Sequence, residues 1–209
     1  MKLENNEIYK TLGWRRTFHE LVMKPIGYHL SSKILRGELL KAIGEVRGKR
    51  IIDVSCGDDY FPIILAKMGA IVTCNDICFD AMRPLLKYGC YVAFTNKNLM
   101  EVNHERKFDV VLFKNTFHHL KNVTQIRKTL KSLKNLGRKI IIMDIDDPTK
   151  DFLGKVWNTY YRKVLKDQGD MFIGYDSFKF HINEIFKRHK VEFKRIRTIK
   201  GWYMLAIIN

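Results

Sequence analysis

Two aspartates and a turn of small residues are the first side chains whose types and spacing suggest chemistry. The segment Ile51-Ile52-Asp53-Val54-Ser55-Cys56-Gly57 runs from apolar residues into a carboxylate and then into residues with short side chains. Small residues let backbone N–H groups approach a ligand closely, and Gly57 supplies conformational freedom where the chain reverses. The sequence therefore predicts a ligand-binding turn over residues 53–57.

Asp76 follows a second apolar run and lies 76 − 57 = 19 residues beyond Gly57. In sheets that bind nucleotides, an acid at this spacing receives the two hydroxyls of a ribose. Hydrogen bonds to a charged carboxylate contribute about 1.5–3 kcal/mol each. The alternative is that Asp53 and Asp76 only cap the helices after them. The joint occurrence of both acids with the turn favours ligand binding.

His118 and His119 are the residues that could move a proton. A neutral imidazole can act as a general base near neutral pH. The alternative is that the pair anchors its loop through hydrogen bonds. If only one histidine acts in catalysis, we expect it to be His118 and expect His119 to pack.

Two further groups resemble metal sites, but the sequence predicts no metal. Asp144, Asp146 and Asp147 could bind magnesium or orient a substrate, but such a cluster is more often a solvated turn with a helix cap. Cys74 and Cys78 have no second ligand pair at zinc-like spacing. We expect the cysteines to be reduced thiols.

The elements that would position these residues alternate along the chain. Apolar runs predict five strands, at residues 50–54, 70–74, 91–95, 108–113 and 139–144. Helical spacing predicts helices between them, at residues 60–68, 79–87 and 122–136, the last closed by Gly137. This alternation implies right-handed crossovers and a parallel sheet, covered by helices on both faces, which binds ligands at the carboxyl ends of its strands.

The 209 residues predict a single domain, 1–209, built around this sheet. Its expected parts are N-terminal helices at 1–48, a ligand-binding core at 49–145, insert or lid helices at 146–189 and a hairpin at 190–209. The insert should hold helices at 152–165 and 177–188, and the hairpin should join strands 191–199 and 202–208 through Lys200-Gly201. We therefore expect an α/β, doubly wound, Rossmann-like fold with an N-terminal helical cap and a seven-stranded sheet, mostly parallel with an antiparallel C-terminal strand.

With these residues, the chain resembles the class I S-adenosylmethionine-dependent methyltransferases, particularly the small single-domain members. The resemblance covers about residues 45–145 by motif. Asp53-Val54-Ser55-Cys56-Gly57 looks like the family's first motif, and Asp76-Ile77 looks like its ribose acid. Residues 108–120 look like its fourth-strand signature, and Asn98-Leu99 stands where the family places an acid beside the adenine.

The resemblance implies S-adenosylmethionine as the cofactor, with His118 and His119 at the catalytic end of the fourth strand. The cofactor-binding residues that it implies are Asp53, Ser55, Cys56, Gly57, Asp76, Ile77, Asn98, Leu99 and Asn115. Ser55 and Asp59 stand where the family prefers glycine, and Asn98 where it prefers aspartate. Asn98 can still accept a hydrogen bond from the adenine amino group. The carboxylate of Asp59 would lie near that of the cofactor, unless it turns toward the ammonium or sulfonium.

Three hypotheses for function follow. We expect methyl transfer to an oxygen, nitrogen or carbon of a small-molecule acceptor, in a pocket formed by the N-terminal helices and residues 150–180. An RNA methyltransferase is the second, because a net charge of +16 attracts polyanions, although the basic residues are scattered through every segment. A non-catalytic or degenerate cofactor-binding protein is the third, suggested by Asp59 and Asn98.

The sequence also bears on the location of the protein and on whether it could bind a nicotinamide cofactor instead. Residues 1–10 contain no apolar run of the kind that a signal peptide or spanning helix needs, so we expect a cytoplasmic protein without membrane contact. A nicotinamide dehydrogenase is disfavoured because Gly57 is not followed by the glycine spacing of a pyrophosphate turn. The sequence gives no oligomeric state.

Overall fold

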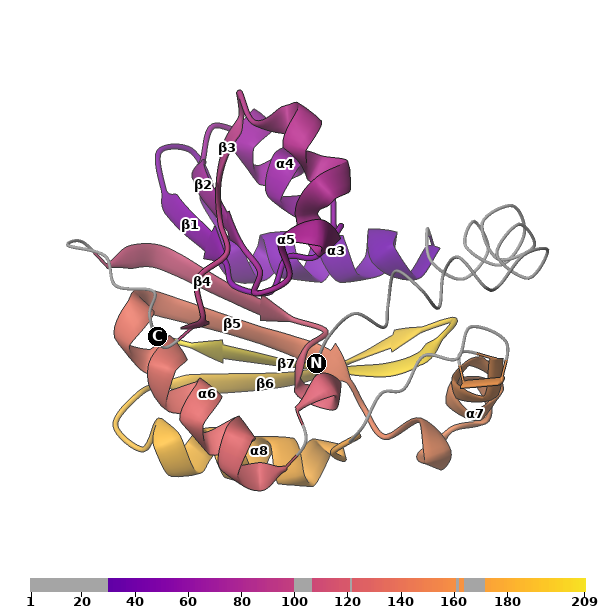
Figure 1. Cartoon of the computed structure of the whole chain (residues 1–209). Coiled ribbons are helices and arrows are strands. Elements are labelled where there is room, and N and C mark those ends of the chain that lie inside the picture. Colours follow the sequence, from indigo (N-terminus) through magenta and orange to yellow (C-terminus); the bar gives the residue numbers. More distant parts are fainter. Residues whose placement is uncertain (1–29, 100–106, 121, 161, 164–171) are drawn as a thin grey trace.

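The computed structural model describes residues 30–99, 107–120, 122–160, 162–163 and 172–209, arranged around a seven-stranded sheet (Figure 1). The strand order is β3-β2-β1-β4-β5-β7-β6. The strands are β1 (Arg50–Asp53), β2 (Ile71–Asn75), β3 (Val92–Thr95), β4 (Phe108–Lys114), β5 (Gly137–Ile145), β6 (Val191–Thr198) and β7 (Gly201–Ile208). Strands β1 to β5 pair in parallel, whereas β7 is antiparallel to both β5 and β6. The predicted sheet, with its antiparallel C-terminal strand, is confirmed.

Helices cover both faces of the sheet. On one face lie α3 (Leu30–Ile43), α4 (Phe61–Lys67) and the short α5 (Phe79–Met82), and on the other lie α6 (Val123–Leu136) and α8 (Tyr175–Ile185) (Figure 1). Helix α7 (Phe152–Tyr160) contacts the start of β7, where the indole N–H of Trp157 donates to the carbonyl of Ile199 at 2.9 Å. The helices expected within residues 1–29 lie outside the described residues, so α3 is the described part of the N-terminal cap.

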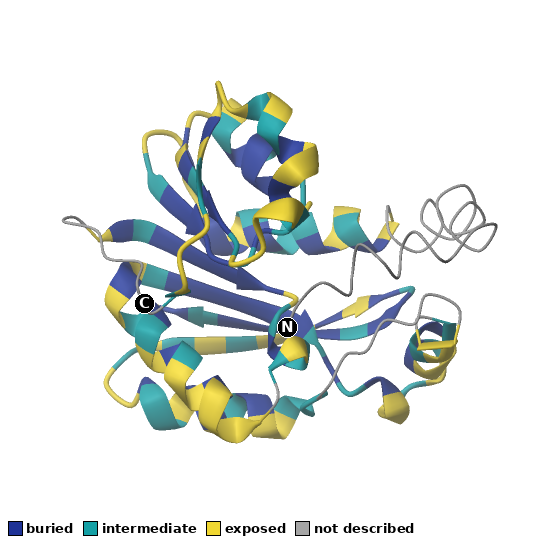
Figure 2. Cartoon of the chain, viewed as in Figure 1, coloured by how far each residue is buried: buried dark blue, intermediate teal, exposed yellow. Residues whose placement is uncertain are grey.

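Two-sided coverage explains the continuous apolar runs of the central strands. In β4, Val110 and Leu112 pack beneath α3 and α4, whereas Val111 and Phe113 pack beneath α6 and α8. The central strands are accordingly buried over most of their length (Figure 2). Parallel strands of this kind show no polar face, as expected for a sheet between two helical layers.

Helix α8 begins and ends two to three residues earlier than expected, and two further boundary differences have a clear local cause. The helix expected at 79–87 splits into α5 and a 3-10 helix, Arg83–Tyr88, because Pro84 has no N–H for an α-helical bond and its ring crowds the preceding turn. Gly137 follows the last residue of α6 as its C-cap, as predicted, but it also begins β5 in an extended conformation, two residues before the strand start expected at Lys139. A Cβ atom there would lie 2.5 Å from Cγ2 of Val111, so the strand requires glycine at this point.

None of the helices in the described part of the chain is both long and apolar enough to cross a membrane.

Candidate active site

The carboxyl ends of β1, β2, β4 and β5 meet at one edge of the sheet and bring distant side chains together. Asp53 ends β1, Asp76 follows β2, Lys114 ends β4 and Asp144 lies one residue before the end of β5. Because parallel strands all run in one direction, side chains far apart in sequence converge at this edge. The predicted acids are therefore neighbours in space.

The turn after β1 is tied directly to the acid after β2. The backbone N–H of Gly57 donates to Oδ2 of Asp76 at 3.0 Å, and that of Cys78 donates to Oδ1 at 2.9 Å. Gly57 has a φ of +50°, a left-handed conformation that glycine adopts without a steric penalty. Cys78, not Asp76, is the N-cap residue of α5, so Asp76 holds the loop before this helix and does not cap it. Each carboxylate oxygen keeps a second lone pair, which leaves Asp76 able to accept ribose hydroxyls.

Backbone contacts from β2 hold the rest of the turn. The Asn75 side chain donates to the carbonyl of Val54 at 3.1 Å, and the N–H of Cys56 donates to the carbonyl of Asn75 at 3.2 Å. A hydrogen bond with Cys74, together with burial, raises the pKa of the Cys56 thiol, so the thiol stays protonated and unreactive. Ser55 is half-buried. Cys56 therefore supports the turn from inside.

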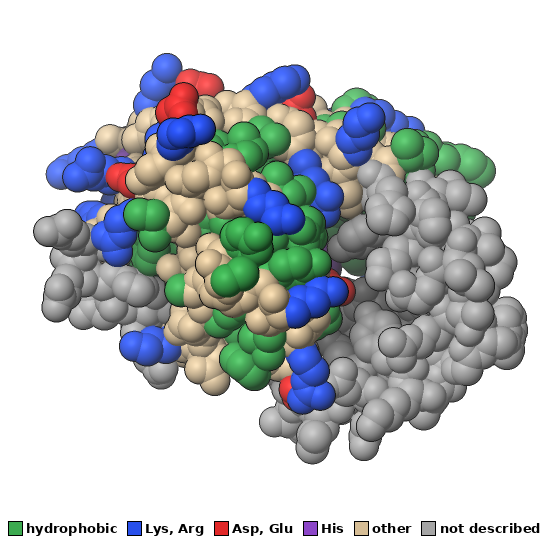
Figure 3. Space-filling view, turned by 90° about the horizontal axis from the view of Figure 1, so that it is seen from above, with side chains coloured by type: hydrophobic (Ala, Val, Ile, Leu, Met, Phe, Trp, Pro, Cys, Tyr) green, Lys and Arg blue, Asp and Glu red, His purple; other side chains and the backbone are tan. Residues whose placement is uncertain are grey.

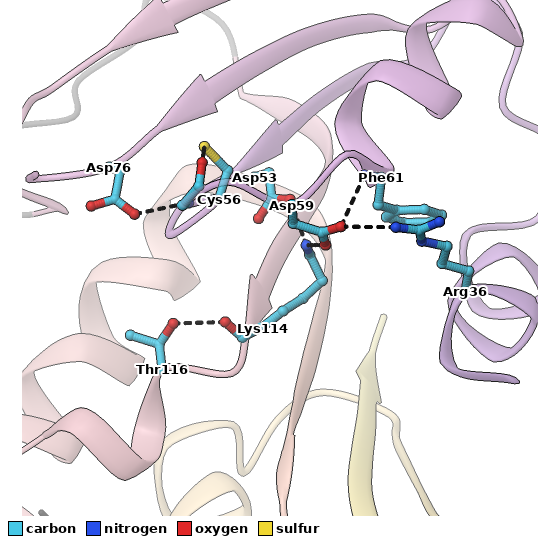
Figure 4. A network of polar contacts seen from close by, with 9 residues as sticks. Arg36, Asp53, Cys56, Asp59, Phe61, Asp76, Lys114 and Thr116 are labelled. Carbon is cyan, nitrogen blue, oxygen red and sulfur yellow. Dashed lines mark hydrogen bonds and ion pairs between the residues drawn. The ribbon is translucent and has the colours of Figure 1, made fainter. Parts of the chain in front are cut away.

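Lys114 is the charged residue that the sequence reasoning missed. Its Nζ lies 2.8 Å from Oδ2 of Asp53 and 2.6 Å from Oδ2 of Asp59, and its side chain is 3% exposed (Figure 4). Oδ1 of Asp59 accepts the N–H of Phe61 at 3.0 Å and lies 3.5 Å from the Arg36 guanidinium of α3. Asp59, which departs from the glycine pattern, is thus paired with two bases. A lysine directly after the apolar run at residues 110–113 was the available signal.

Burial and charge shift the pKa values of this cluster in different directions. Burial raises the pKa of Asp53 to about 6, with Lys114 opposing and Asp59 adding to the shift. Burial alone would lower the pKa of Lys114, but Asp53 and Asp59 outweigh it and raise that pKa, so the lysine stays charged. Burial would also raise the pKa of Asp59, but Lys114, the Phe61 amide and Arg36 lower it.

Asp53 also provides a test of whether an S-adenosyl group fits. Its carboxylate is buried, and Oδ1 has no hydrogen-bond partner among the described residues. A buried carboxylate oxygen without a donor is costly, and the ammonium of a methionyl group would supply one. The edge therefore combines an acid suited to a ribose, Asp76, with one suited to an ammonium.

His118 is paired with a buried carboxylate. Its Nδ1 lies 2.7 Å from Oδ1 of Asp144, which is 1% exposed. Oδ2 of Asp144 accepts the N–H groups of Thr116 and Phe117 at 2.8 and 2.6 Å. The pair thus anchors the loop and orients the imidazole, so the two interpretations of His118 are compatible. His119 is exposed, and its ring centroid lies 4.1 Å from that of His118.

The remaining acids after β5 have separate structural roles. Asp146 is buried, accepts the N–H of Tyr175 at 3.0 Å and lies 2.7 Å from Arg195. Asp147 accepts the N–H of Thr149 at 2.9 Å and caps a short 3-10 helix. The solvated-turn interpretation is therefore wrong for Asp144 and Asp146, and the capping part of it is right for Asp147.

The other proposed cofactor-binding residues lie along the same edge. Ile77 is 57% exposed beside Asp76, and Asn98 is also exposed, whereas Leu99 is half-buried against the α6 side of the core. Asn115 is exposed with a φ of +50°, and its N–H donates to the carbonyl of Met143 at 2.8 Å. Their contacts with the cofactor stay predictions.

The fold and this edge of the sheet define a class I S-adenosylmethionine-dependent methyltransferase. A family model described as "Methyltransferase domain" matches residues 28–204, and the chain belongs to this family. S-adenosylmethionine is its methyl donor, and the protein is an enzyme.

Individual relatives are distant. The chain is 25% identical over 178 residues to the ubiquinone biosynthesis O-methyltransferase of Bordetella parapertussis, covering 82% of this chain and 72% of the relative. Magnesium protoporphyrin IX methyltransferase (ChlM) from Synechocystis PCC 6803 with bound SAH superposes with a TM-score of 0.68 at 17% identity, covering 97% and 96% of the two chains. The N-methyltransferase NodS from Bradyrhizobium japonicum WM9 gives a TM-score of 0.64 at 12% identity, covering 87% and 97%. These structures support the fold.

Proposed function

We propose that this enzyme methylates a hydroxyl oxygen of a small molecule, with His118 as the general base and Asp144 as its positioning residue. The observation that carries the proposal is the 2.7 Å contact between Nδ1 of His118 and Oδ1 of Asp144. The cofactor, when bound, supplies a methyl group already activated on a sulfonium. The protein's task is then to align the acceptor, exclude water and remove a proton.

The histidine–carboxylate pair favours an oxygen acceptor over an amine. An ionised carboxylate only accepts hydrogen bonds, so Nδ1 of His118 carries the proton and Nε2 carries the lone pair. That tautomer can take the proton of a hydroxyl group as its oxygen attacks. An uncharged amine needs no base before attack, so it would gain less from a histidine–carboxylate pair than a hydroxyl group would.

Residues at the other end of the site would hold the donor. Asp76 accepts the ribose hydroxyls, Ile77 and Leu99 contact the adenine, and Asn98 accepts from its amino group. Ser55, Gly57 and Asn115 bring backbone close to the donor. The support is their common position at the carboxyl ends of the strands.

We further propose a hydroxylated aromatic acceptor. The ring of Phe172 stacks on His118 with centroids 5.7 Å apart and planes 9° from parallel. This places an apolar ring beside the proposed base, which suits a flat acceptor. The ubiquinone biosynthesis O-methyltransferase similarity points in the same direction.

The charge on the face drawn in Figure 3 gives less support to an RNA acceptor. Lys and Arg side chains on the face in Figure 3 are interspersed with hydrophobic and acidic ones. A single basic stripe would be the expected footprint of a nucleic acid. We therefore place the small-molecule acceptor first.

The test is methyl transfer from labelled S-adenosylmethionine to matched phenols, catechols, anilines and thiols, with products identified by mass spectrometry. We expect O-methyl products, and a loss of about 10²–10⁴-fold in kcat for His118→Gln. His189→Gln, in the turn between α8 and β6, is the matched histidine control. Methylation of amines alone, or full kcat in His118→Gln, would contradict the proposal.

A further inference from the structure

The strand order places Asp76 and Lys114 on opposite sides of the turn after β1. Strand β1 lies between β2, which Asp76 follows, and β4, which Lys114 ends. If the ribose of the donor lies on Asp76, an amino-acid tail that crosses the β1 turn would lie near the end of β4. Asp53, Asp59 and Lys114 lie there (Figure 4).

The charges of this cluster are complementary to that tail. The tail carries one ammonium and one carboxylate, whereas the cluster carries two carboxylates and the Lys114 ammonium. The ammonium of Lys114 already lies between the two acids, at 2.8 and 2.6 Å. Asp53 is fully buried and is already in contact with Lys114, so a ligand ammonium that reaches Asp53 would compete with Lys114 for it.

We infer that Lys114 is an exchangeable counter-ion that releases Asp53 and Asp59 to the ammonium of the donor and takes the donor's carboxylate in return. This role rests on the proposed donor site. Exchange leaves every ion with a partner of opposite charge, whereas simple displacement would leave a buried lysine unpaired, which is strongly unfavourable. Lysine suits the role because its ammonium is a compact charge on a flexible stem.

Arg36 is the rival group for the donor carboxylate. It lies on α3, 3.5 Å from Oδ1 of Asp59, and its side chain is 33% exposed. Its contact with Asp59 is longer than that of Lys114, and the structure shows no contact between it and Asp53 among the described residues. The experiment therefore has to separate the two bases.

The test compares S-adenosylmethionine with decarboxylated S-adenosylmethionine, which lacks only the carboxylate, by titration calorimetry. Loss of a charge-assisted contact corresponds to about 10- to 150-fold in affinity, so we expect the unmodified protein to prefer S-adenosylmethionine by this factor. In Lys114→Gln the ratio should fall to near one, and in Lys114→Arg a preference should persist. Lys139→Gln removes a half-buried lysine from the opposite end of β5 and should keep the full ratio.

Folding is checked by circular dichroism, because Lys114→Gln leaves two acids with less compensation. The double variant Asp59→Asn with Lys114→Gln removes one charge of each sign and should also give a ratio near one. An unchanged ratio in both variants, or loss of the ratio in Arg36→Gln but not in Lys114→Gln, would overturn the role of Lys114.

Failure of the donor site gives a different result. Binding of neither compound to the folded, unmodified protein would refute the site itself and this role with it. Equal binding of both compounds to the unmodified protein would refute only the proposed contact between Lys114 and the carboxylate of the donor.

Discussion

The backbone N–H of Gly57 donates a hydrogen bond of 3.0 Å to Oδ2 of Asp76, which joins the turn after β1 to the acid after β2. The acid that we assign to the ribose therefore also shapes the turn on which the donor lies. Binding of the donor and the conformation of the turn are coupled through one carboxylate.

Replacement of Asp76 should accordingly weaken donor binding strongly. Asp76→Ala removes both ribose hydrogen bonds, each worth about 1.5–3 kcal/mol, and should weaken S-adenosylhomocysteine binding by at least about 100-fold in calorimetry. Asp80→Asn is the matched control, because Asp80 is exposed and pairs with Arg83. Retained affinity in Asp76→Ala would mean that the ribose lies elsewhere.

Asp144→Asn should change the rate and its pH dependence without changing donor affinity. The imidazolium formed during proton transfer would lose its anionic partner, so kcat should fall at least about tenfold. For the same reason, the pH at which activity is lost on acidification should move downward. Steady-state rates across pH, with donor affinity from calorimetry, check both effects. An unshifted profile would leave Asp144 with a purely structural role.

The stability of the protein should depend on pH through Asp53. Its pKa is about 6 in the folded protein and about 3.9 in the unfolded chain, so between these values the folded state binds more protons. Stability contributed by the protonated acid is therefore lost as the pH rises through this window. The pKa of Asp59 is lowered, so that acid titrates below the window.

Asp53→Asn isolates this effect. From pH 4 to pH 7 the free energy of unfolding of the unmodified protein should fall by about 2 kcal/mol relative to the variant, since one pKa unit corresponds to about 1.36 kcal/mol and the unfolded acid is half-ionised near pH 4. Urea denaturation at several pH values measures both proteins. Parallel curves would show that Asp53 has the same pKa folded and unfolded.

Alanine substitutions at two glycines should change the stability of the protein in opposite directions. Gly137→Ala would place a Cβ 2.5 Å from Val111 Cγ2 and 3.0 Å from the carbonyl oxygen of Phe108, so we expect a loss of about 1–3 kcal/mol. Gly37→Ala, within α3, meets nothing within 4 Å and should stabilise the protein by about 0.5–1 kcal/mol. Chemical denaturation distinguishes the two signs, and equal effects would contradict this packing.

Much of the fold was accessible from the sequence because periodicity reports local structure. The apolar runs around residues 51, 72 and 110 predicted buried parallel strands, and the structure confirms them. The boundary errors explained above lie at Pro84, which splits the predicted helix, and at the start of β5, which is Gly137 and not Lys139. In both cases the position of the boundary depends on contacts between a few atoms, and the spacing of hydrophobic residues does not report such contacts.

The site was only partly accessible. The sequence brought Asp53, Gly57 and Asp76 together because their spacing along the chain reflects a local turn between adjacent strands, and the structure places them at one edge of the sheet. The partners of Asp59 and His118 were not predicted, because Lys114 lies 55 residues from Asp59, and Asp144 lies 26 residues from His118. Which side chains meet across strands β1, β4 and β5 depends on tertiary register, and no short-range pattern records it.

The position of β7 has a consequence for synthesis of the protein. This strand comes after β6 in the chain, yet it inserts between β5 and β6 and pairs with both. A nascent chain that has emerged only as far as β6 exposes the apolar edge of β5, including Ile140 and Ile142, with no strand to receive its hydrogen bonds. Until the ribosome has delivered residues 201–208, the polypeptide is thus at its most vulnerable to aggregation, and chaperone contact should concentrate in that interval.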